Sequence, residues 1–235
     1  MIDLALVLYL VVILPSMRLW RSLQKSITPR RPRVQVYGTA IREIAILLVA
    51  LLLASWWSGH GAADLGLAPP DSGAALWCLL IPAILLPLLH YAGKLRQRSL
   101  NPEQLAADYE RLRRDESLPR TKRELNLYLV LSVFLGAGWE LLYRGFLLLA
   151  LTPVMGVWRT VIIAGVAYGA AHGYTSRKQI GASIVSALLF AGGYALTGSL
   201  WWLIVLHTGL PAMTAIAYYK IINQDDGDKA QAVSP

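Results

Sequence analysis

The stretch "NLYLVLSVFLGAGWELLYRGFLLLA", residues 126–150, carries only two charged side chains, Glu140 and Arg144. A helix needs about 20 mostly apolar residues to cross the hydrocarbon core of a bilayer, so this stretch predicts a transmembrane helix. Its two charges are four residues apart, which puts them on one helix face within ion-pair reach. Charges at this depth are costly and usually face a partner inside the bundle. The pair indicates either a buried salt bridge that holds helices together or a functional site.

The composition of the whole chain agrees with a membrane location. Hydrophobic residues make up 56% of the 235 residues, charged residues only 15%, and the mean hydropathy is +0.49. Soluble domains contain about 25% charged residues, so the composition excludes an ordinary soluble protein. The single cysteine, Cys78, cannot form an internal disulfide, and we interpret it as a small apolar side chain.

Six further apolar runs resemble the first in length, and together they predict an all-α bundle of about seven transmembrane helices. The runs cover residues 2–17, 42–58, 75–92, 126–150, 158–175, 180–197 and 200–221. The N-terminal run, 2–17, lacks a basic start and a small-residue cleavage site, so we expect a retained helix and not a signal peptide. We expect one domain over residues 1–222, followed by a disordered polar tail, 223–235.

Basic residues alternate along the loops in a way that predicts the orientation of the bundle. The loop 18–43 holds seven Lys and Arg residues and the loop 93–124 holds nine, whereas the loops 59–74 and 198–199 hold none. Because Lys and Arg accumulate on the cytoplasmic side, this pattern predicts an outside N-terminus, an inside C-terminus and seven crossings. The net charge of +8 then faces anionic lipid, and we expect no nucleic-acid partner.

The long loop 93–124 mixes both charge signs at helical spacing. This mixture predicts an amphipathic or solvated helix at the cytoplasmic surface. A segment that docks substrate is the alternative interpretation.

Two of the four histidines lie where packing alone rarely needs them. His60 and His90 fall near helix ends, and we interpret both as structural. His172, in "AYGAAHGYTS", and His207, in "WWLIVLHTGLPA", stand among apolar neighbours on late helices. Together with Glu140 and Arg144 on another helix, they form a set that indicates an intramembrane site.

Three motifs in this order resemble those of the CPBP family, the CAAX-protease and bacteriocin-processing intramembrane endopeptidases. "ELLYRGFLL" matches the first motif at Glu140 and Arg144, "YGAAH" matches the second at His172, and "LWWLIVLHTGLP" matches the third at His207. Tyr168 stands where the second motif usually has Phe. The similarity covers roughly residues 126–215.

The resemblance implies an enzyme that hydrolyses a peptide bond with activated water. Glu140 or His172 would be the base, His207 would stabilise the oxyanion, and Arg144 would position Glu140. We expect no cofactor, although Glu140, His172 and His207 could also be metal ligands. No zinc motif H-E-x-x-H and no serine or aspartate nucleophile signature occurs in the sequence. The substrate would be a membrane protein or peptide, with or without a prenyl group, and the protein would be multi-pass in a bacterial inner membrane.

Two positions depart from the family pattern. The first motif usually begins with two glutamates, and Trp139 replaces the first of them; Pro211 replaces the Asn that usually follows the third-motif histidine by four residues. These changes favour an alternative function, a catalytically inactive relative that acts as a membrane interaction or immunity protein. A transporter is a third interpretation, since paired charges inside a membrane also suit ion pathways.

The spacing of glycines and the depth of the motif residues bear on how the helices pack. Gly165, Gly169 and Gly173 predict a face of small residues that allows close helix approach. Glu140 and His207 lie about 14 residues, or roughly 21 Å, from the cytoplasmic helix ends, whereas His172 lies only a few residues from Arg177. For these groups to meet, the helix over 158–175 must tilt, or extend past its apparent end, or the boundary assigned here must be wrong by about one turn.

Overall fold

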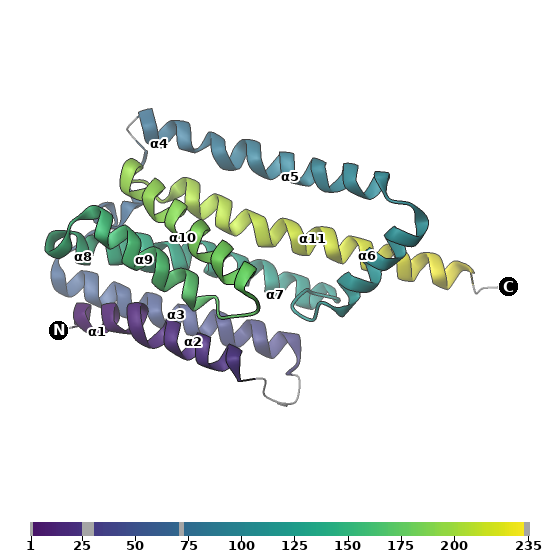
Figure 1. Ribbon diagram of the computed structural model, residues 1–235, viewed down its shortest axis with the longest axis horizontal. Coiled ribbons are helices and arrows are strands. Elements are labelled where there is room, and N and C mark those ends of the chain that lie inside the picture. Colours follow the sequence, from purple (N-terminus) through teal and green to yellow (C-terminus); the bar gives the residue numbers. More distant parts are fainter. Residues whose placement is uncertain (1, 25–30, 71–72, 233–235) are drawn as a thin grey trace.

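The computed structural model describes residues 2–24, 31–70 and 73–232, with side chains described through Asn223, and these residues form helices and no strand (Figure 1). The all-α prediction is confirmed. The elements are α1 (Ile2–Leu8), η1 (Tyr9–Ile13), α2 (Leu14–Leu23), α3 (Arg33–Ser58), η2 (Ala63–Leu67), α4 (Gly73–Cys78), α5 (Leu80–Ser99), α6 (Pro102–Arg114), α7 (Lys122–Val133), η3 (Phe134–Gly138), η4 (Leu141–Phe146), α8 (Leu147–Met155), α9 (Val157–Ala171), α10 (Arg177–Thr197) and α11 (Trp201–Ala232). The elements labelled η are short π-helical segments.

Six helical stretches within the described residues are long and apolar enough to span a membrane, so the prediction of seven is corrected to six plus one short helix. The six are Ile2–Leu23, Arg33–Ser58, Gly73–Ser99, Lys122–Met155, Arg177–Thr197 and Trp201–Asn223. The seventh, α9, has 15 residues, or about 22 Å at 1.5 Å per residue, less than the ~30 Å hydrocarbon core. The apolar run 158–175 is longer than its helix because a turn replaces the last four residues.

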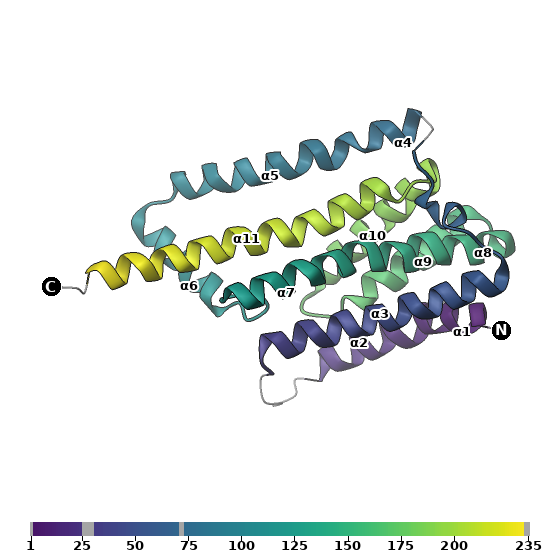
Figure 2. The ribbon, with the colours of Figure 1, turned by 180° about the vertical axis from the view of Figure 1, so that it is seen from behind.

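The connection between α9 and α10 is where the chain turns back before it reaches the end of the bundle. Figures 1 and 2 show that the connection between these two helices stops short of the end that α3 and α7 reach. The early end of α9 therefore places residue 172 inside the length of the bundle. The predicted helix boundary at residue 175 was thus wrong by about one turn, because α9 ends at Ala171.

The core lies among the N-terminal helix, the motif helix and the late helices. Its fully buried members include Leu10 of η1, Leu147 of α8, Ala191 of α10 and Leu203 of α11. The helix α5 lies at the edge of the bundle along α11 (Figures 1 and 2), and Pro82 is its one buried residue. The site described below is thus formed by the central helices, and α5 does not contribute to it.

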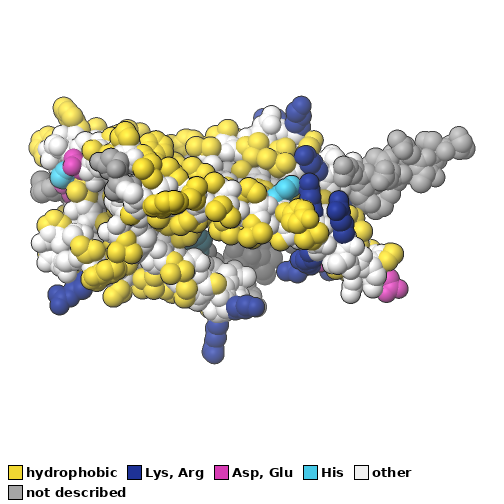
Figure 3. Space-filling model, turned by 90° about the horizontal axis from the view of Figure 1, so that it is seen from above, with side chains coloured by type: hydrophobic (Ala, Val, Ile, Leu, Met, Phe, Trp, Pro, Cys, Tyr) yellow, Lys and Arg dark blue, Asp and Glu magenta, His cyan; other side chains and the backbone are white. Residues whose placement is uncertain are grey.

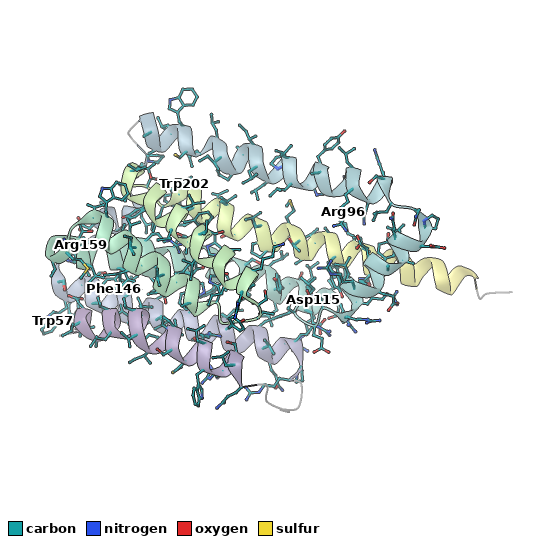
Figure 4. The ribbon with its side chains drawn as sticks, viewed as in Figure 1. Trp57, Arg96, Asp115, Phe146, Arg159 and Trp202 are labelled. Atoms are coloured by element: carbon teal, nitrogen blue, oxygen red, sulfur yellow. The ribbon has the colours of Figure 1, made fainter. Side chains whose placement is uncertain are left out.

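Most of the outer surface is apolar, as a protein surrounded by lipid requires. Figure 3 shows hydrophobic side chains across most of the α5 side, with the visible Lys and Arg side chains gathered mainly where α5 runs into α6. Exposed tryptophans, Trp56, Trp57, Trp77 and Trp158, mark the opposite end, which Figure 4 shows by Trp57 and Arg159. Tryptophan is enriched where a helix meets the membrane interface. The predicted N-out, C-in orientation stays a prediction.

The polar connections differ from the predicted loops. Helices extend into the predicted loop 18–43 from both sides, because α2 continues to Leu23 and α3 already begins at Arg33. In the loop 93–124, α6 forms with an Asn101–Gln104 capping box and no buried residue, as expected for a solvated helix. The backbone of α11 is helical to Ala232, and residues 233–235 lie outside the described part. The expected disorder of the tail 223–235 stays a prediction.

Candidate active site

Glu140, His207 and Tyr168 form a hydrogen-bonded chain across three helical segments. Nδ1 of His207 lies 2.7 Å from Oε1 of Glu140, and Nε2 of His207 lies 3.2 Å from the hydroxyl of Tyr168. A carboxylate only accepts hydrogen bonds, so Nδ1 carries a hydrogen and donates it to Glu140. In neutral His207, Nε2 then accepts the hydroxyl hydrogen of Tyr168. The carboxylate therefore sets both the tautomer and the direction of the imidazole.

Glu140 and Arg144 form a fully buried ion pair beside this chain. Their side chains are 0% and 1% exposed, and Nε of Arg144 lies 3.3 Å from Oε2 of Glu140. The guanidinium lies 4.3 Å above the Tyr168 ring, and its Nη2 donates to the carbonyl of Ala187 at 3.3 Å. The two oxygens of Glu140 therefore face His207 and Arg144. This placement suits a carboxylate with a positioning role. It is less suited to a base that takes a proton from water.

The local backbone places Trp139 and Glu140 between two π-helical segments, η3 and η4. Such wide turns are common at functional sites because they change the direction of successive side chains. Adjacent helical residues point about 100° apart. Glu140 accordingly points into the core, whereas the partly exposed Trp139 faces the cavity described below.

His172 lies at the end of α9, next to Tyr168. Its Nδ1 is 2.9 Å from the carbonyl oxygen of Tyr168, and the two rings meet edge to face with centroids 4.7 Å apart. Because a carbonyl oxygen only accepts, Nδ1 of His172 is the donor and Nε2 keeps a free lone pair. His172 is therefore the histidine whose second nitrogen can accept a proton.

The turn after His172 is attached to α2. Gly173 has φ +74°, and the backbone N–H of Tyr174 donates to Oγ of Ser22 at 2.8 Å. A Cβ added at Gly173 would lie 3.3 Å from Cβ of Ser22 and 3.5 Å from the carbonyl oxygen of Arg18. Ser22 also donates to the carbonyl of Leu19 at 2.8 Å, which fixes its hydroxyl. The N-terminal helix thus sets the position of His172.

Replacing Gly173 with Ala is expected to destabilise the protein by about 1–2 kcal/mol, because a left-handed backbone is strained for residues with a Cβ. The new methyl group would also push the turn from α2 and displace His172, so activity should fall as well. The thermal midpoint in detergent measures the first effect. Gly181→Ala is the matched control, since Gly181 lies in α10 with open space around it. Equal midpoints for both variants would contradict the attachment.

The two histidines and Tyr168 lie on a cavity of about 410 Å³. His172, His207, Tyr168, Trp139 and Pro211 line it together with Arg18, and Leu14, Ala40, Ile44, Leu135 and Ala171 complete the lining. Glu140 is not in the lining, because His207 and Arg144 cover it. Pro211 has no N–H, so the carbonyl of His207 lacks its helical donor at this level.

The four residues singled out in the sequence, Glu140, Arg144, His172 and His207, thus lie within one site, with both histidines on the cavity. His60 and His90 are exposed and outside it. Two residues of the site were not predicted: Arg18, which was counted only as a loop cation, and Ser22. The glycine directly after His172 was the available signal for the turn. No group of three His, Cys, Asp or Glu side chains that could hold a metal occurs in the part of the chain that the structure describes.

The glycines predicted to form one packing face divide between two partners. A Cβ on Gly165 would lie 2.6 Å from Cδ2 of Leu188, and one on Gly169 would lie 2.6 Å from Cα of Ile184, so both allow α10 to approach closely. Gly173 instead faces α2 through the turn. The face predicted from three glycines is therefore made of two.

Residues 121–213 match the family model described as type II CAAX prenyl endopeptidase Rce1-like. The predicted family resemblance is confirmed. The Rce1-like segment runs from the start of α7 to the Pro211 region of α11 and agrees with the predicted 126–215 within a few residues. It contains all four motif residues, whereas Arg18 and Ile44 of the cavity lie before it. Neither the curated proteins nor the solved structures contain a match to the chain.

Proposed function

We propose that this protein is an intramembrane endopeptidase of the CAAX type that hydrolyses a peptide bond in the cavity between α2, α3, α9 and α11. The observation that carries the proposal is that His172 and His207, from two helices, share one cavity while a buried carboxylate orients His207. The Rce1-like segment supports protease chemistry. Residues that only hold a bundle together do not need a free imidazole nitrogen on a cavity.

His172 is the base in this mechanism. Its Nε2 takes a proton from water, and the oxygen of that water attacks the carbonyl carbon of the substrate. The proton then passes from His172 to the leaving nitrogen as the C–N bond breaks. Glu140 is the weaker choice because it is 0% exposed and its oxygens face His207 and Arg144.

The His207–Tyr168 pair supplies the donor for the oxyanion. A protonated His207 donates its Nε2–H to the oxygen that becomes negative during attack, or to the Tyr168 hydroxyl, whose own hydrogen is then free to donate to that oxygen. Glu140 stabilises a positive His207 because its carboxylate lies 2.7 Å from Nδ1. Arg144 in turn holds Glu140. In this arrangement Glu140 and Arg144 are positioning residues.

The lining of the cavity indicates the class of substrate. Apart from His172, His207, Tyr168 and Arg18, its lining is apolar, which favours a short apolar peptide segment. We propose a membrane protein or peptide as the substrate, with or without a prenyl group. The six apolar spans make the protein multi-pass, and we propose a bacterial inner membrane as its location.

The experiment that tests the function is hydrolysis by the purified protein in proteoliposomes. Quenched fluorescent peptides with apolar C-terminal segments are offered in two forms, prenylated and unmodified. We expect cleavage of at least one form at a single bond, identified by mass spectrometry. If both forms remain intact at enzyme concentrations equal to those of the peptides, the protein is not such an endopeptidase.

Trp139 is the observation that favours a second function, an inactive relative that binds membrane partners. Its indole lines the cavity at the position where the first motif usually has a glutamate, and it packs against Tyr143 and Tyr168 with centroids 5.9 and 6.4 Å away. The indole thus occupies the place of a carboxylate that could activate water.

Replacing Trp139 with Glu separates the two functions. We expect hydrolysis to rise at least tenfold, since a positioned general base contributes about 10²- to 10⁴-fold. Trp139→Gln is the matched control, because it has nearly the same shape without a base. Cleavage by the wild type and a further gain by Trp139→Glu support the endopeptidase. No cleavage by the wild type with cleavage by Trp139→Glu identifies an inactive relative.

A further inference from the structure

Arg18 is a cation on the cavity that lies outside the motifs. It stands on α2, before the Rce1-like segment, and among the described lining residues it is the one with a permanent charge. The lining otherwise consists of apolar side chains and the groups of His172, His207 and Tyr168. The few polar groups in a mostly apolar ligand cavity usually orient the ligand, and a cation among them can hold an anionic group.

The backbone of Arg18 lies directly beside the turn that carries His172. A Cβ added at Gly173, the next residue after His172, would be 3.5 Å from the carbonyl oxygen of Arg18. The Ser22–Tyr174 hydrogen bond of 2.8 Å fixes this contact one helical turn further along α2. The backbone of Arg18 is therefore held next to the turn that carries the proposed base.

The guanidinium of Arg18 has donors to spare. Nη2 alone makes both bonds to Glu43, at 2.7 Å to Oε1 and 2.7 Å to Oε2. A guanidinium has five N–H donors, and among the described residues the Nε and Nη1 groups of Arg18 make no hydrogen bond. The side chains of Arg18 and Glu43 are 38% and 28% exposed. A partly exposed ion pair contributes little stability, so a second carboxylate can join or displace Glu43 at low cost.

We propose that Arg18 is a specificity residue that binds a carboxylate of the substrate within a few residues of the cleaved bond. This inference rests on the proposed function. The planar guanidinium fork matches a carboxylate through two parallel hydrogen bonds, and the apolar part of the cavity holds the side chains between that carboxylate and the bond at His172. The carboxylate is either the C-terminus of the peptide or an acidic side chain.

Binding of labelled peptides to protein in nanodiscs, followed by fluorescence anisotropy, tests the inference. The protein carries His172→Ala so that every peptide stays intact. Three versions of one apolar peptide are compared: a free C-terminal acid, a C-terminal amide, and an amide whose last residue is Asp. We expect the acid to bind about 10- to 100-fold more tightly than the amide, as for a charge-assisted hydrogen bond. The Asp version shows whether a side-chain carboxylate serves equally.

Variants of the ion pair assign this preference to Arg18. Arg18→Gln should reduce the acid-to-amide ratio to about one, whereas Arg21→Gln, on the same helix but outside the cavity lining, should leave it unchanged. Glu43→Gln should preserve or increase it by removing a competing carboxylate. The double variant Arg18→Gln/Glu43→Gln leaves no unpaired charge, so it tests the loss of preference even if Arg18→Gln alone folds poorly.

The outcomes separate this inference from the proposed function. An acid-to-amide ratio that is the same in the His172→Ala protein and in its two Arg18 variants overturns the carboxylate site, whatever the hydrolysis assay finds. A ratio of one in the His172→Ala protein that retains Arg18 and Glu43 overturns it too. A ratio that depends on Arg18 supports the site even when no peptide is cleaved, and in that case only the proposed hydrolysis fails.

Discussion

Replacing Arg144 with Met is expected to destabilise the protein by about 3–5 kcal/mol, the usual cost of leaving one partner of a buried ion pair uncompensated. Both side chains are essentially unexposed, and the lost guanidinium also packs on the Tyr168 ring. Glu140 would keep His207 as its remaining partner. Unfolding of the protein in detergent or bicelles, followed by steric trapping, measures the change in free energy.

A double-mutant cycle gives the control for this prediction. The variant Glu140→Gln/Arg144→Met removes the carboxylate charge as well, so it should be more stable than Arg144→Met alone. Neutral and apolar replacements of a buried pair often restore most of the lost stability. If Arg144→Met unfolds within about 1 kcal/mol of the wild type, a value typical of exposed ion pairs, the buried pair does not hold the site together.

The second large effect concerns activity: His172→Ala should lower kcat by about 10²- to 10⁴-fold, the usual contribution of a general base. The fold should be retained, because His172 makes one hydrogen bond to the backbone and lies at the end of α9. Peptide hydrolysis in proteoliposomes measures kcat, and the thermal midpoint shows that the variant is folded.

His90→Ala is the control for the loss of a histidine. His90 is exposed on α5, away from the cavity, so its replacement should leave kcat unchanged. A His172→Ala variant that cleaves as fast as His90→Ala would remove His172 from the role of base. The water would then have to be activated by His207, the other histidine on the cavity.

The membrane class and the motif residues could be predicted because they depend on local composition and order. Six of the seven apolar runs are helices long enough to span a membrane, since the hydropathy of a segment does not depend on what packs beside it. The spacing of Glu140 and Arg144 likewise predicted a contact that the structure shows at 3.3 Å. Boundaries were less accurate, as for α3, which begins at Arg33 instead of near 42 because helix continues beyond the apolar part.

The partners of the motif residues could not be predicted from their own segments. The sequence left Glu140 as one of two candidate bases. Only the packing of α11 against the motif helix shows that His207 forms a hydrogen bond to one oxygen of Glu140. In the same way, the end of α9 at Ala171 depends on a turn that bonds to α2, a helix about 150 residues earlier. Contacts over such distances depend on the rotation and depth of each helix.

The sequence by itself determined that this is a helical membrane protein with Glu140, Arg144 and His207 at membrane depth, because apolar length and charge cost are properties of each segment. Only the tertiary structure decided which of these groups face a cavity. One residue along a helix is a rotation of about 100°, so Glu140 lies in the core while Trp139 lines the cavity. The packing of α2 against the end of α9 likewise brought Arg18 to the site.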